Sequence, residues 1–506
     1  MKKIIPVLIA VFLCAFFPYS ASSSDSSFLK TPHFIIQYNE SITPHAYAVA
    51  ERAENHYRNI ESFLSYSLND EIKISIDDVK SLSGVLDFDS IKISPAVNYY
   101  DADNTLYRLI FNRFLVSIFA PATRVFKFNA VSGIIADTLC SYSITGFNIS
   151  DELVLRDAFL RSGNGKVNIS EFNKYSNDTI KAAYAGFFYY IESVYGRKVM
   201  IRALKDSSYY GGFFNSLISV TGKSYQEFNS EFNAFLSGKF ADNAFKNDKI
   251  RFLDLPVNAL VDDFFIRNNK LVVLAETDGN FSIIIIDLNK EKPLLSKALP
   301  ENLYFKSICP VNDNNFAVAG HSGDSSTVFI YNTDSCFMTK KIDLPGIYIN
   351  TINNSGKDEI LFLNSVYGIS KGIIKTDYNS GVLNKKNSAY IAGSSDIIFN
   401  GESVYYIIKR DSCDLVQYNI STSEELPLLK LQDEMASLST AGDNIIITAN
   451  NSSGGYVALY NRENGTLESL LSGCPLLYKA FVSDRNIYML AYCNGSRRII
   501  IQELTR

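Results

Sequence analysis

The sequence predicts a multidomain protein in which an α+β domain is followed by an all-β, six-bladed propeller. Three observations lead to this fold class. A short apolar leader opens the chain, early strands and later helices follow it, and a β-rich pattern then repeats every 41 to 45 residues. We therefore expect a signal peptide over 1–24, an α+β domain over 25–240, a linker over 241–249 and a propeller over 250–506.

The leader has the order of a signal peptide. Lys2 and Lys3 precede the largely apolar run Ile4–Phe17, and the small-residue stretch Ser20–Ser24 follows Pro18. The run is short for a membrane span, so we expect cleavage near residues 21–24 and a periplasmic or secreted protein. A retained anchor is the alternative. No other segment is apolar enough to span a membrane, and we expect no transmembrane segment in the mature chain.

Composition and charge restrict the function. Of 506 residues, 47% are hydrophobic and 20% are charged, as in folded domains. The net charge is −5 without any basic cluster, which argues against a nucleic-acid partner. Six cysteines remain beyond the leader without metal-site spacing, so we expect most of them to be buried, with a Cys474–Cys493 disulfide as the alternative.

The first domain begins with strand patterns and continues with helical ones. Strands are expected at Pro32–Tyr38, Ile72–Ile76 and Ile91–Ile93, and a long helix at His45–Ser65. From Asp103 onward the pattern is almost entirely helical. This order predicts a small sheet with helices collected on one side of it.

The apolar helix Thr105–Phe119 has the register of a His-Glu-x-x-His zinc helix, in which two imidazoles on one face hold the metal. Asn112, Arg113 and Val116 stand at those three positions. Further on, Ile134–Tyr142 is similar to a second motif, Trp-x-x-Glu-Gly-x-Ala-x-Tyr, and places Asp137 where the third ligand, Glu, belongs.

The order of these segments resembles the peptidase MA (gluzincin, thermolysin-like) domain of exported bacterial proteins. Further similarity lies in the first strand, a loop and the tail of that domain, at His33–Tyr38, Asn164–Asn173, Ala183–Ile191, Tyr195–Leu204 and Thr221–Leu236. The resemblance implies a zinc held by two His and one Glu, with a further Glu that deprotonates the attacking water.

The chain lacks the side chains that this chemistry needs. Valine cannot bind a metal, asparagine is a poor zinc ligand, and arginine serves neither as ligand nor as general base. Of the four side chains at these positions, only that of Asp137 could coordinate zinc. We therefore expect a pseudoenzyme with no catalytic residues, no metal and no cofactor, in which Asn112, Arg113, Val116 and Asp137 mark a vestigial site.

No relocated site is evident. The four histidines never stand four residues apart. We expect His33 on a strand, His45 at a helix start, His56 facing solvent and His321 in a propeller loop. The segment Leu160–Glu171 echoes an EF-hand loop but has too few carboxylates to bind calcium.

The C-terminal half repeats one design of polar turns and strands. The repeats begin at Leu271, Phe316, Ile360, Val404, Ile445 and Ile487, and each is followed by a paired strand that ends in an acidic residue, Tyr-Asn or a similar pair. The last repeat lacks an outer strand. Arg251–Pro256 resembles Lys340–Pro345, the outer strand of the second repeat, so we expect residues 250–256 to close the last blade. A solenoid is the alternative; the pattern resembles WD-like or TolB-like bacterial envelope propellers.

Together these features predict an exported, non-catalytic protein that binds a protein or glycan partner in the cell envelope. Two alternatives stay open, an exported hydrolase or lyase with an unrecognised site on the propeller and a structural role in the envelope. Loops around Asp278, Asp324 and Asp411 are the candidate contact surface. Convergence of His, Asp, Arg or Tyr at the mouth of the propeller axis would favour the enzyme.

Overall fold

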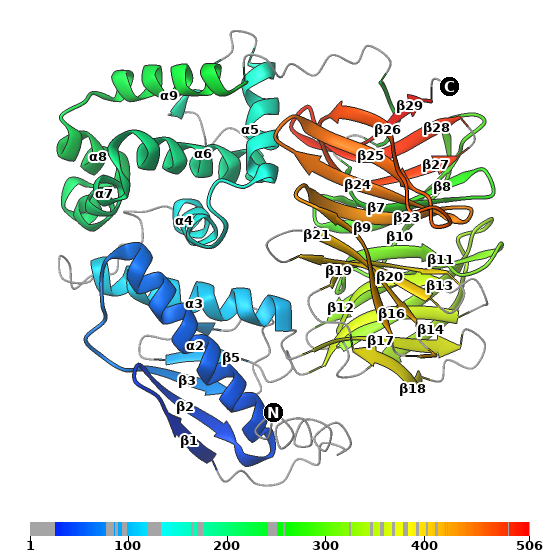
Figure 1. The fold of residues 1–506 in the computed structure, drawn as a ribbon, viewed down its shortest axis with the longest axis horizontal. Helices are drawn as coiled ribbons and strands as arrows, with labels where there is room; N and C mark the ends of the chain where they lie inside the picture. The colour runs from blue at the N-terminus through cyan, green and yellow to red at the C-terminus, as the bar shows by residue number, and fades with distance from the viewer. Residues whose placement is uncertain are drawn as a thin grey trace. The chain divides into compact units, whose positions relative to one another are not determined.

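The computed structural model forms two compact units (Figure 1). The first comprises Met1–Lys127 with Val366–Ile369, and the second comprises Phe128–Ser365 with Ser370–Arg506. The structure describes residues 26–504 except 77–84, 87–89, 94–98, 120–132, 163–165, 170–175, 241–249, 257–258, 323–324, 345–347, 355–358, 367–369, 378–382, 391–393, 401–402, 410–412, 420, 423 and 484. The predicted signal peptide and linker therefore lie outside the described residues.

The first unit contains a five-stranded mixed sheet in the order β1-β2-β3-β5-β4. Its strands are β1 (Ser26–Lys30), β2 (Phe34–Asn39), β3 (Ile72–Ile76), β4 (Val85–Leu86) and β5 (Ser90–Ile93). Alternate residues of β2 and β3, such as Phe34, Ile36 and Ile74, are fully buried, so one face of the sheet forms a core. The helix α2 (Thr43–Leu64) contacts β2 and α3 (Tyr99–Phe119), and α3 contacts β5.

Six helices begin the second unit. They are α4 (Gly133–Thr145), α5 (Ile149–Arg161), α6 (Asn177–Tyr195), α7 (Arg197–Tyr210), α8 (Phe213–Thr221) and α9 (Tyr225–Phe240). A buried aromatic cluster that includes Phe187 and Phe232 joins α6 to α8 and α9. Helices α5 and α6 cross closely at Gly186, where an added Cβ would lie 2.3 Å from Leu155 Cδ2.

The rest of the second unit is a β-propeller. Five of its sheets are built from four consecutive strands each. The first two sheets contain β7 (Leu260–Arg267), β8 (Lys270–Thr277), β9 (Asn280–Asp287) and β10 (Lys292–Ala298), then β11 (Tyr304–Pro310), β12 (Asn315–Ser322), β13 (Ser325–Asn332) and β14 (Met338–Leu344). The next two contain β15 (Tyr348–Asn354), β16 (Glu359–Val366), β17 (Ser370–Asp377) and β18 (Leu383–Tyr390), then β19 (Ser394–Asn400), β20 (Ser403–Lys409), β21 (Cys413–Asn419) and β22 (Glu425–Leu431). The fifth contains β23 (Glu434–Ala441), β24 (Asn444–Asn451), β25 (Gly454–Tyr460) and β26 (Leu467–Cys474).

A further four-stranded sheet is composite. It joins β27 (Leu476–Ser483), β28 (Asn486–Cys493) and β29 (Ser496–Glu503) to β6 (Arg251–Phe252), which comes from the other end of the propeller sequence. Ile500 pairs with Phe252, and the Leu253 backbone N–H donates to the Ile499 carbonyl oxygen at 3.0 Å. The strand is thus two residues long, shorter than the expected 250–256, and it provides the missing partner for β29.

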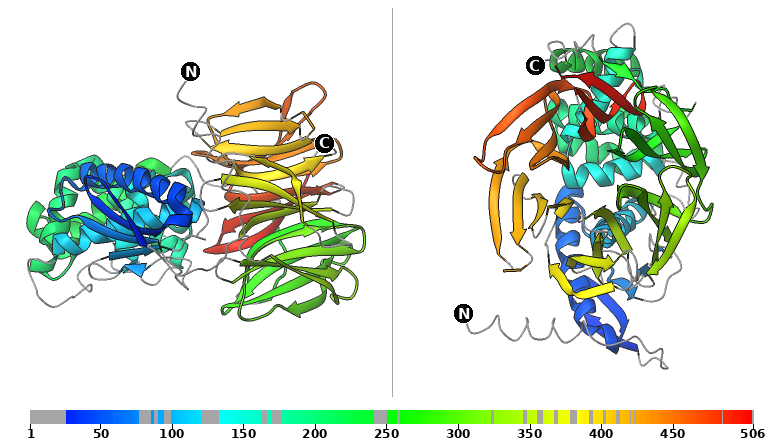
Figure 2. Two further views of the ribbon diagram at one scale, coloured as in Figure 1. Left: turned by 90° about the horizontal axis from the view of Figure 1, so that it is seen from below. Right: turned by 90° about the vertical axis from the view of Figure 1, so that its right-hand side faces the viewer.

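The sheets are arranged around an axis (Figure 2). The first strand of each sheet contacts the first strand of the next, in the order β7, β11, β15, β19, β23 and β27, and β27 contacts β7. In every sheet the pairing of this inner strand with its neighbour is interrupted by a bulge, as between Val261 and Asp263 or between Leu477 and Lys479. The predicted propeller fold is confirmed.

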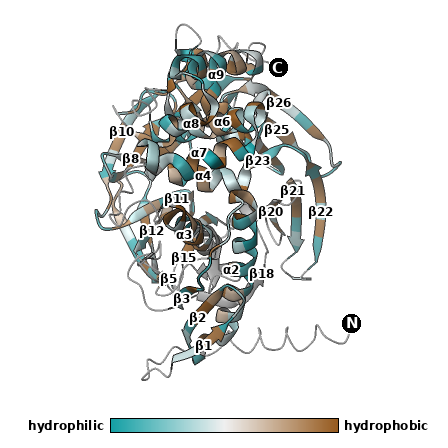
Figure 3. Ribbon diagram, turned by 90° about the vertical axis from the view of Figure 1, so that its left-hand side faces the viewer, coloured by the Kyte–Doolittle hydropathy of each residue, from teal (hydrophilic) through white to brown (hydrophobic). Residues whose placement is uncertain are grey.

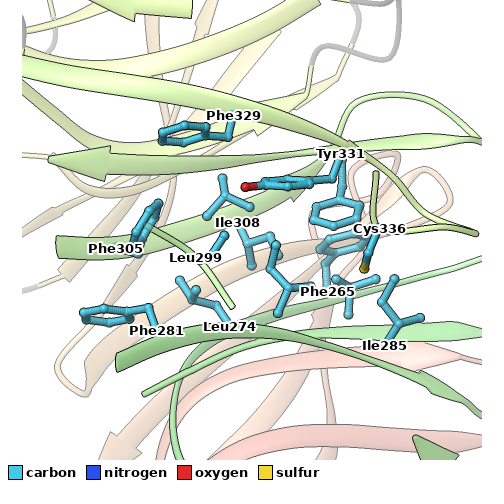
Figure 4. Close-up of a cluster of buried hydrophobic side chains, with 14 residues drawn as sticks. Phe265, Leu274, Phe281, Ile285, Leu299, Phe305, Ile308, Phe329, Tyr331 and Cys336 are labelled. Carbon is cyan, nitrogen blue, oxygen red and sulfur yellow. The ribbon is translucent and has the colours of Figure 1, made fainter. Parts of the chain in front are cut away.

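Two local features explain why the sequence repeats so regularly. Hydrophobic residues recur along the propeller strands (Figure 3). Apolar side chains pack between neighbouring sheets (Figure 4), and Phe265, Phe305 and Phe316 belong to one such cluster. In four sheets an Asn or Asp at the end of the third strand, or just after it, accepts backbone N–H groups of the next turn with its side chain; these residues are Asp287, Asn332, Asn419 and Asn461. Asn332 Oδ1, for example, accepts the backbone N–H groups of Asp334 and Ser335, both at 3.0 Å.

The six cysteines of the described residues are all buried, and none of them forms a disulfide with another described residue. They are Cys140, Cys309, Cys336, Cys413, Cys474 and Cys493. Cys474 and Cys493 share one apolar cluster with Leu477 and Met489. Burial raises the pKa of both of these thiols to about 12, which keeps them protonated and unreactive near neutral pH.

Candidate functional site

Three of the four positions that the sequence analysis predicts to be vestigial lie on one helix. Asn112, Arg113 and Val116 are half-buried residues of α3, whereas Phe111 and Phe114 on the same helix are fully buried. Asp137 is exposed on α4, which belongs to the other compact unit. The structure therefore brings together the first three positions and gives no geometry that joins them to Asp137.

The helix α3 is not buried on all sides, because the side that carries Asn112, Arg113 and Val116 is only half-buried. The polar groups of Asn112 and Arg113 account for this partial exposure, because burial would cost the hydration of these groups. Among the described residues, no group of three or more His, Cys, Asp or Glu side chains is placed to hold a metal ion.

The structure places some of the histidines in environments that differ from those expected from the sequence. His33 precedes β2 and its Nδ1 lies 2.7 Å from Glu54 Oε2 on α2, while its ring stacks on Tyr57 at 3.8 Å. Glu54 also accepts the His33 backbone N–H and the Thr31 hydroxyl, so this carboxylate holds the β1–β2 turn. These hydrogen bonds outweigh burial and lower the pKa of Glu54.

Two of the expected histidine positions are wrong, because His33 lies one residue before β2 and His321 lies on a strand. His56 is half-buried, and its ring packs edge-on against Tyr107 of α3 at 5.1 Å. His321 is not in a loop. It lies on β12, where it is 3% exposed, its Nδ1 is 2.9 Å from Ser326 Oγ, and burial lowers its pKa to about 4.

The described part of the EF-hand-like segment is held by protein groups. The Asn233 side chain accepts the Val167 backbone N–H at 2.6 Å and donates to the Val167 carbonyl at 3.0 Å. The Ile169 N–H donates to Asn229 Oδ1 at 3.1 Å. Side-chain amides of α9 thus satisfy the backbone of this segment.

A polar contact joins α5 to two turns of the propeller. Arg156 is 4% exposed, and its Nη1 donates to the carbonyl oxygens of Ser452 and Ser453 at 3.3 and 3.2 Å. The neighbouring Asp157 accepts the backbone N–H groups of Asn494 and Gly495 at 3.2 and 3.3 Å. We call these two side chains the α5 clamp. Burial lowers the pKa of Arg156, but arginine remains charged throughout the ordinary pH range.

The start of α6 makes a second contact with the propeller. The hydroxyl of Tyr492 on β28 lies 2.9 Å from Ser176 Oγ and 2.6 Å from Thr179 Oγ1. Ser176 is the N-cap of α6, so the side chain that caps the start of this helix also attaches the helix to a blade. Neither contact could be read from the sequence, because more than 300 residues separate the partners.

A charged cluster lies close to this contact. Arg497 of β29 stacks on the Tyr478 ring at 4.8 Å, and its Nη1 lies 3.7 Å from Asp262 Oδ1 on β7. Burial raises the pKa of Asp262 to about 6 and that of Tyr478 to about 12. Asp262 Oδ2 is buried and hydrogen-bonds to no other protein atom of the described residues. An acid of this kind can exchange a proton near neutral pH.

The adjacent residue ties three inner strands together. Asp263 on β7 is 2.6 Å from Lys479 Nζ on β27 and accepts the Ile308 backbone N–H of β11 at 3.0 Å. Its Oδ1 also accepts the Phe264 N–H, so both carboxylate oxygens are occupied. The sequence criterion for an enzyme was convergence of His, Asp, Arg or Tyr at the mouth of the propeller axis. Here Asp262 and Tyr478 lie on the inner strands β7 and β27, Arg497 lies on the third strand β29, and the Asp263–Lys479 pair joins neighbouring inner strands.

The contact loops named from the sequence are only partly described. Asp278 forms the β8–β9 turn with Gly279, is exposed, and has a φ of 51°. Asp324 and Asp411 lie outside the described residues. By strand order, the β8–β9, β24–β25 and β28–β29 turns lie at the same end of their sheets, and the α5 clamp covers the latter two.

Comparisons with known proteins identify no family. No family profile matches the chain, and no curated protein matches it significantly. The chain is similar to the acylaminoacyl peptidase of Pyrococcus horikoshii with 13% identity and a TM-score of 0.35, over 49% of this chain and 46% of that one. It therefore spans less than half the length of that enzyme.

Two other solved structures show likeness over about half of the chain. The β-propeller domain of the trilobed protease from Pyrococcus furiosus has 12% identity and a TM-score of 0.36, over 50% of this chain and 85% of that one. The WD40 repeats of RRP9 have 11% identity and a TM-score of 0.40, over 51% and 98%. Such distant likeness says nothing about activity. No helix in the described ranges has the length and hydropathy needed to cross a membrane.

Proposed function

We propose that this is an exported, non-catalytic protein of the cell envelope in which a six-bladed propeller binds a protein or glycan partner. The observation that carries the proposal is the propeller itself, a rigid stack of sheets that presents many turns at one end. A fold of this kind suits a binding or scaffold role. The α5 clamp occupies two of these turns, and the exposed turn at Asp278 is available for a partner.

We further propose that the preceding region, residues 25–240, derives from a gluzincin-like peptidase and has lost its chemistry. The support is the pattern of Asn112, Arg113 and Val116 on one side of α3, with Asp137 on α4. None of the first three side chains can replace a zinc-binding imidazole or a general base. Residues 25–240 would then serve to bind a partner or to support the propeller.

The purified mature protein is expected to contain no stoichiometric zinc and to cleave no general protein substrate. Elemental analysis by mass spectrometry and a casein-cleavage assay would measure both properties. The control is Asp137→Ala, which removes the one side chain at these positions that could coordinate zinc. About one zinc per chain, lost in Asp137→Ala, would refute the pseudo-peptidase proposal.

Charge reversal at the Asp278 end of the propeller is expected to weaken partner capture while the fold is kept. The variant is Asp278→Lys, alone and with Asp324→Lys and Asp411→Lys, and capture is measured by cross-linking and affinity purification from the native envelope. Glu463→Lys is the matched control, because it makes the same charge change in the exposed β25–β26 turn at the other end of the strands. Equal losses in both variants, or capture that survives removal of residues 250–506, would contradict the assignment.

The alternative function, a hydrolase or lyase, has one specific observation in its favour. Asp262 combines a raised pKa with Arg497 and Tyr478 beside it, a set that could move a proton on a bound substrate. The cluster holds no nucleophile with an activating base, and Arg497 already pairs with Asp262. We therefore place binding ahead of catalysis.

A further inference from the structure

The residue that follows the bulge of an inner strand makes a recurring contact across the seam between two neighbouring propeller sheets. Asp263 follows the bulge of β7, and its Oδ2 accepts the Ile308 backbone N–H of β11 at 3.0 Å. Ser307 follows the bulge of β11, and its Oγ accepts the Ile352 backbone N–H of β15 at 3.2 Å. At both seams a buried polar side chain therefore satisfies a backbone N–H of the next inner strand.

The seam between the fifth sheet and the composite sheet departs from this pattern. Ser437 follows the bulge of β23 and is 6% exposed, yet its Oγ has no hydrogen-bond partner in the described part of the chain. Thr448 of β24 lies opposite Ser437 in the register and is 1% exposed, and the same holds for its Oγ1. The first two sheets have apolar residues, Leu274 and Ala319, at the place of Thr448. This seam therefore carries two buried hydroxyls that need a partner.

Printed contacts on both sides of these hydroxyls place them against β27. The Ser439 hydroxyl donates to the Ala480 carbonyl oxygen at 2.6 Å. The Asn450 side chain donates to the Leu477 carbonyl oxygen and accepts the Leu477 N–H, both at 2.9 Å. Ser439 and Asn450 each lie two positions from one of the two hydroxyls, so they share its face of the sheet. The hydroxyls thus lie between two direct contacts with β27, beside its bulge.

The backbone N–H of Ala480 is directed to the same place. The Ala480 carbonyl points away from β28, because it accepts the Ser439 hydroxyl, and in an antiparallel ladder the N–H of a residue points to the same side as its carbonyl. In β27, Ala480 stands one residue after the position that follows the bulge, as Ile308 and Ile352 do in their own strands. By this equivalence its N–H is the group that faces Ser437.

We propose that Ser437 Oγ, Thr448 Oγ1 and the Ala480 N–H bind one buried water molecule that joins the fifth sheet to the composite sheet. A buried water typically makes about three hydrogen bonds to groups that would otherwise be unsatisfied. The water accepts the N–H and donates to the hydroxyls. Across the seam the fully buried side chains of Ala480 and Ala491 are single methyl groups, which take up little of the space between the sheets.

The inference depends neither on a partner nor on the function of the propeller. If the seam were dry, two hydroxyls and an amide would be removed from water without compensation, and each loss would destabilise the fold. The Asp263 and Ser307 seams avoid this loss by direct contact. The water replaces that direct contact at the seam where a second hydroxyl is present.

A crystal structure of the mature protein, at a resolution that shows ordered water, tests the proposal directly. We expect a water oxygen within about 3.2 Å of Ser437 Oγ, Thr448 Oγ1 and Ala480 N. The internal control is the Ser307 seam, where the direct bond to Ile352 N should leave no water between the two atoms. An empty site at Ser437, or a water that reaches only one of the three atoms, would overturn the proposal.

Substitutions give a second test that does not need crystals. Thr448→Val and Ser437→Ala should each raise the equilibrium constant for unfolding about fivefold, measured by urea denaturation and circular dichroism, because each removes a partner of the water. The double variant should have a smaller effect than the product of the two, because both hydroxyls bind the same molecule. Thr448→Ser, which keeps the hydroxyl, should retain the water.

Ser216→Ala is the matched control. Its hydroxyl on α8 is also fully buried without a partner among the described residues, but it stands alone on a helix, so its removal should leave the unfolding constant unchanged or lower it. The proposal would be wrong if Thr448→Val and Ser437→Ala behaved like Ser216→Ala. Independent, fully multiplicative effects of the two substitutions would equally exclude a shared water.

Discussion

Replacing Arg156 with Met and Asp157 with Ala should split the unfolding of the second unit into two transitions. The pair removes four hydrogen bonds between α5 and the propeller turns, two of them to the carbonyls of Ser452 and Ser453. It also removes the Arg156 partner of the carbonyls of Ser452 and Ser453, whose hydrogen bonds are part-buried. We expect the attachment of the helices to lose about 3–5 kcal/mol, because hydrogen bonds to charged groups contribute about 1.5–3 kcal/mol each and are not additive.

Differential scanning calorimetry would measure this effect, with the unmodified protein expected to unfold the helices and propeller together. Asp206→Ala is the matched control, because it removes an exposed ion pair with Arg202 on the same helical layer. An exposed pair of this kind contributes at most about 1 kcal/mol. If the double variant and the control both unfolded like the unmodified protein, the α5 clamp would not be what joins the two parts.

Leu253→Pro should destabilise the propeller by about 3 kcal/mol and promote aggregation. Proline removes the N–H that donates to the Ile499 carbonyl, and it replaces a side chain that is 7% exposed. Because β6 is only two residues long, this hydrogen bond is a large part of what covers the outer edge of β29. An uncovered edge is a template for pairing with other chains.

The control for this prediction is the neighbouring Asp254→Pro. Asp254 is exposed, so the same substitution there tests the conformational effect of proline without the loss of a buried side chain. Chemical denaturation followed by light scattering would compare the two variants. Equal stability of Leu253→Pro and the unmodified protein would show that residues 251–253 do not close the last sheet.

Local sequence determined the repeating strands and most of their positions. The repeat starts at Phe316 and Ile445 fall within β12 and β24, and His45–Ser65 corresponds to α2 with small changes at its ends. Alternating apolar residues and the Asn or Asp of each turn act on neighbours a few residues away, so they can be read directly. The short strands β1 and β4 were missed, because two to five residues carry too weak a pattern.

Contacts over long sequence distances decided the rest. The chain shows nothing that would mark Arg156 and Asp157 as a clamp, because their partners lie 296 to 338 residues away. The same is true of His321, which the sequence placed in a loop and the fold buries on β12. The sequence by itself determined the period of the repeats and the turns, since these depend on residue type and short spacing. Only the tertiary structure decided which charges are dehydrated and which helices are attached to which blades, because removal of a side chain from water depends on every segment packed around it.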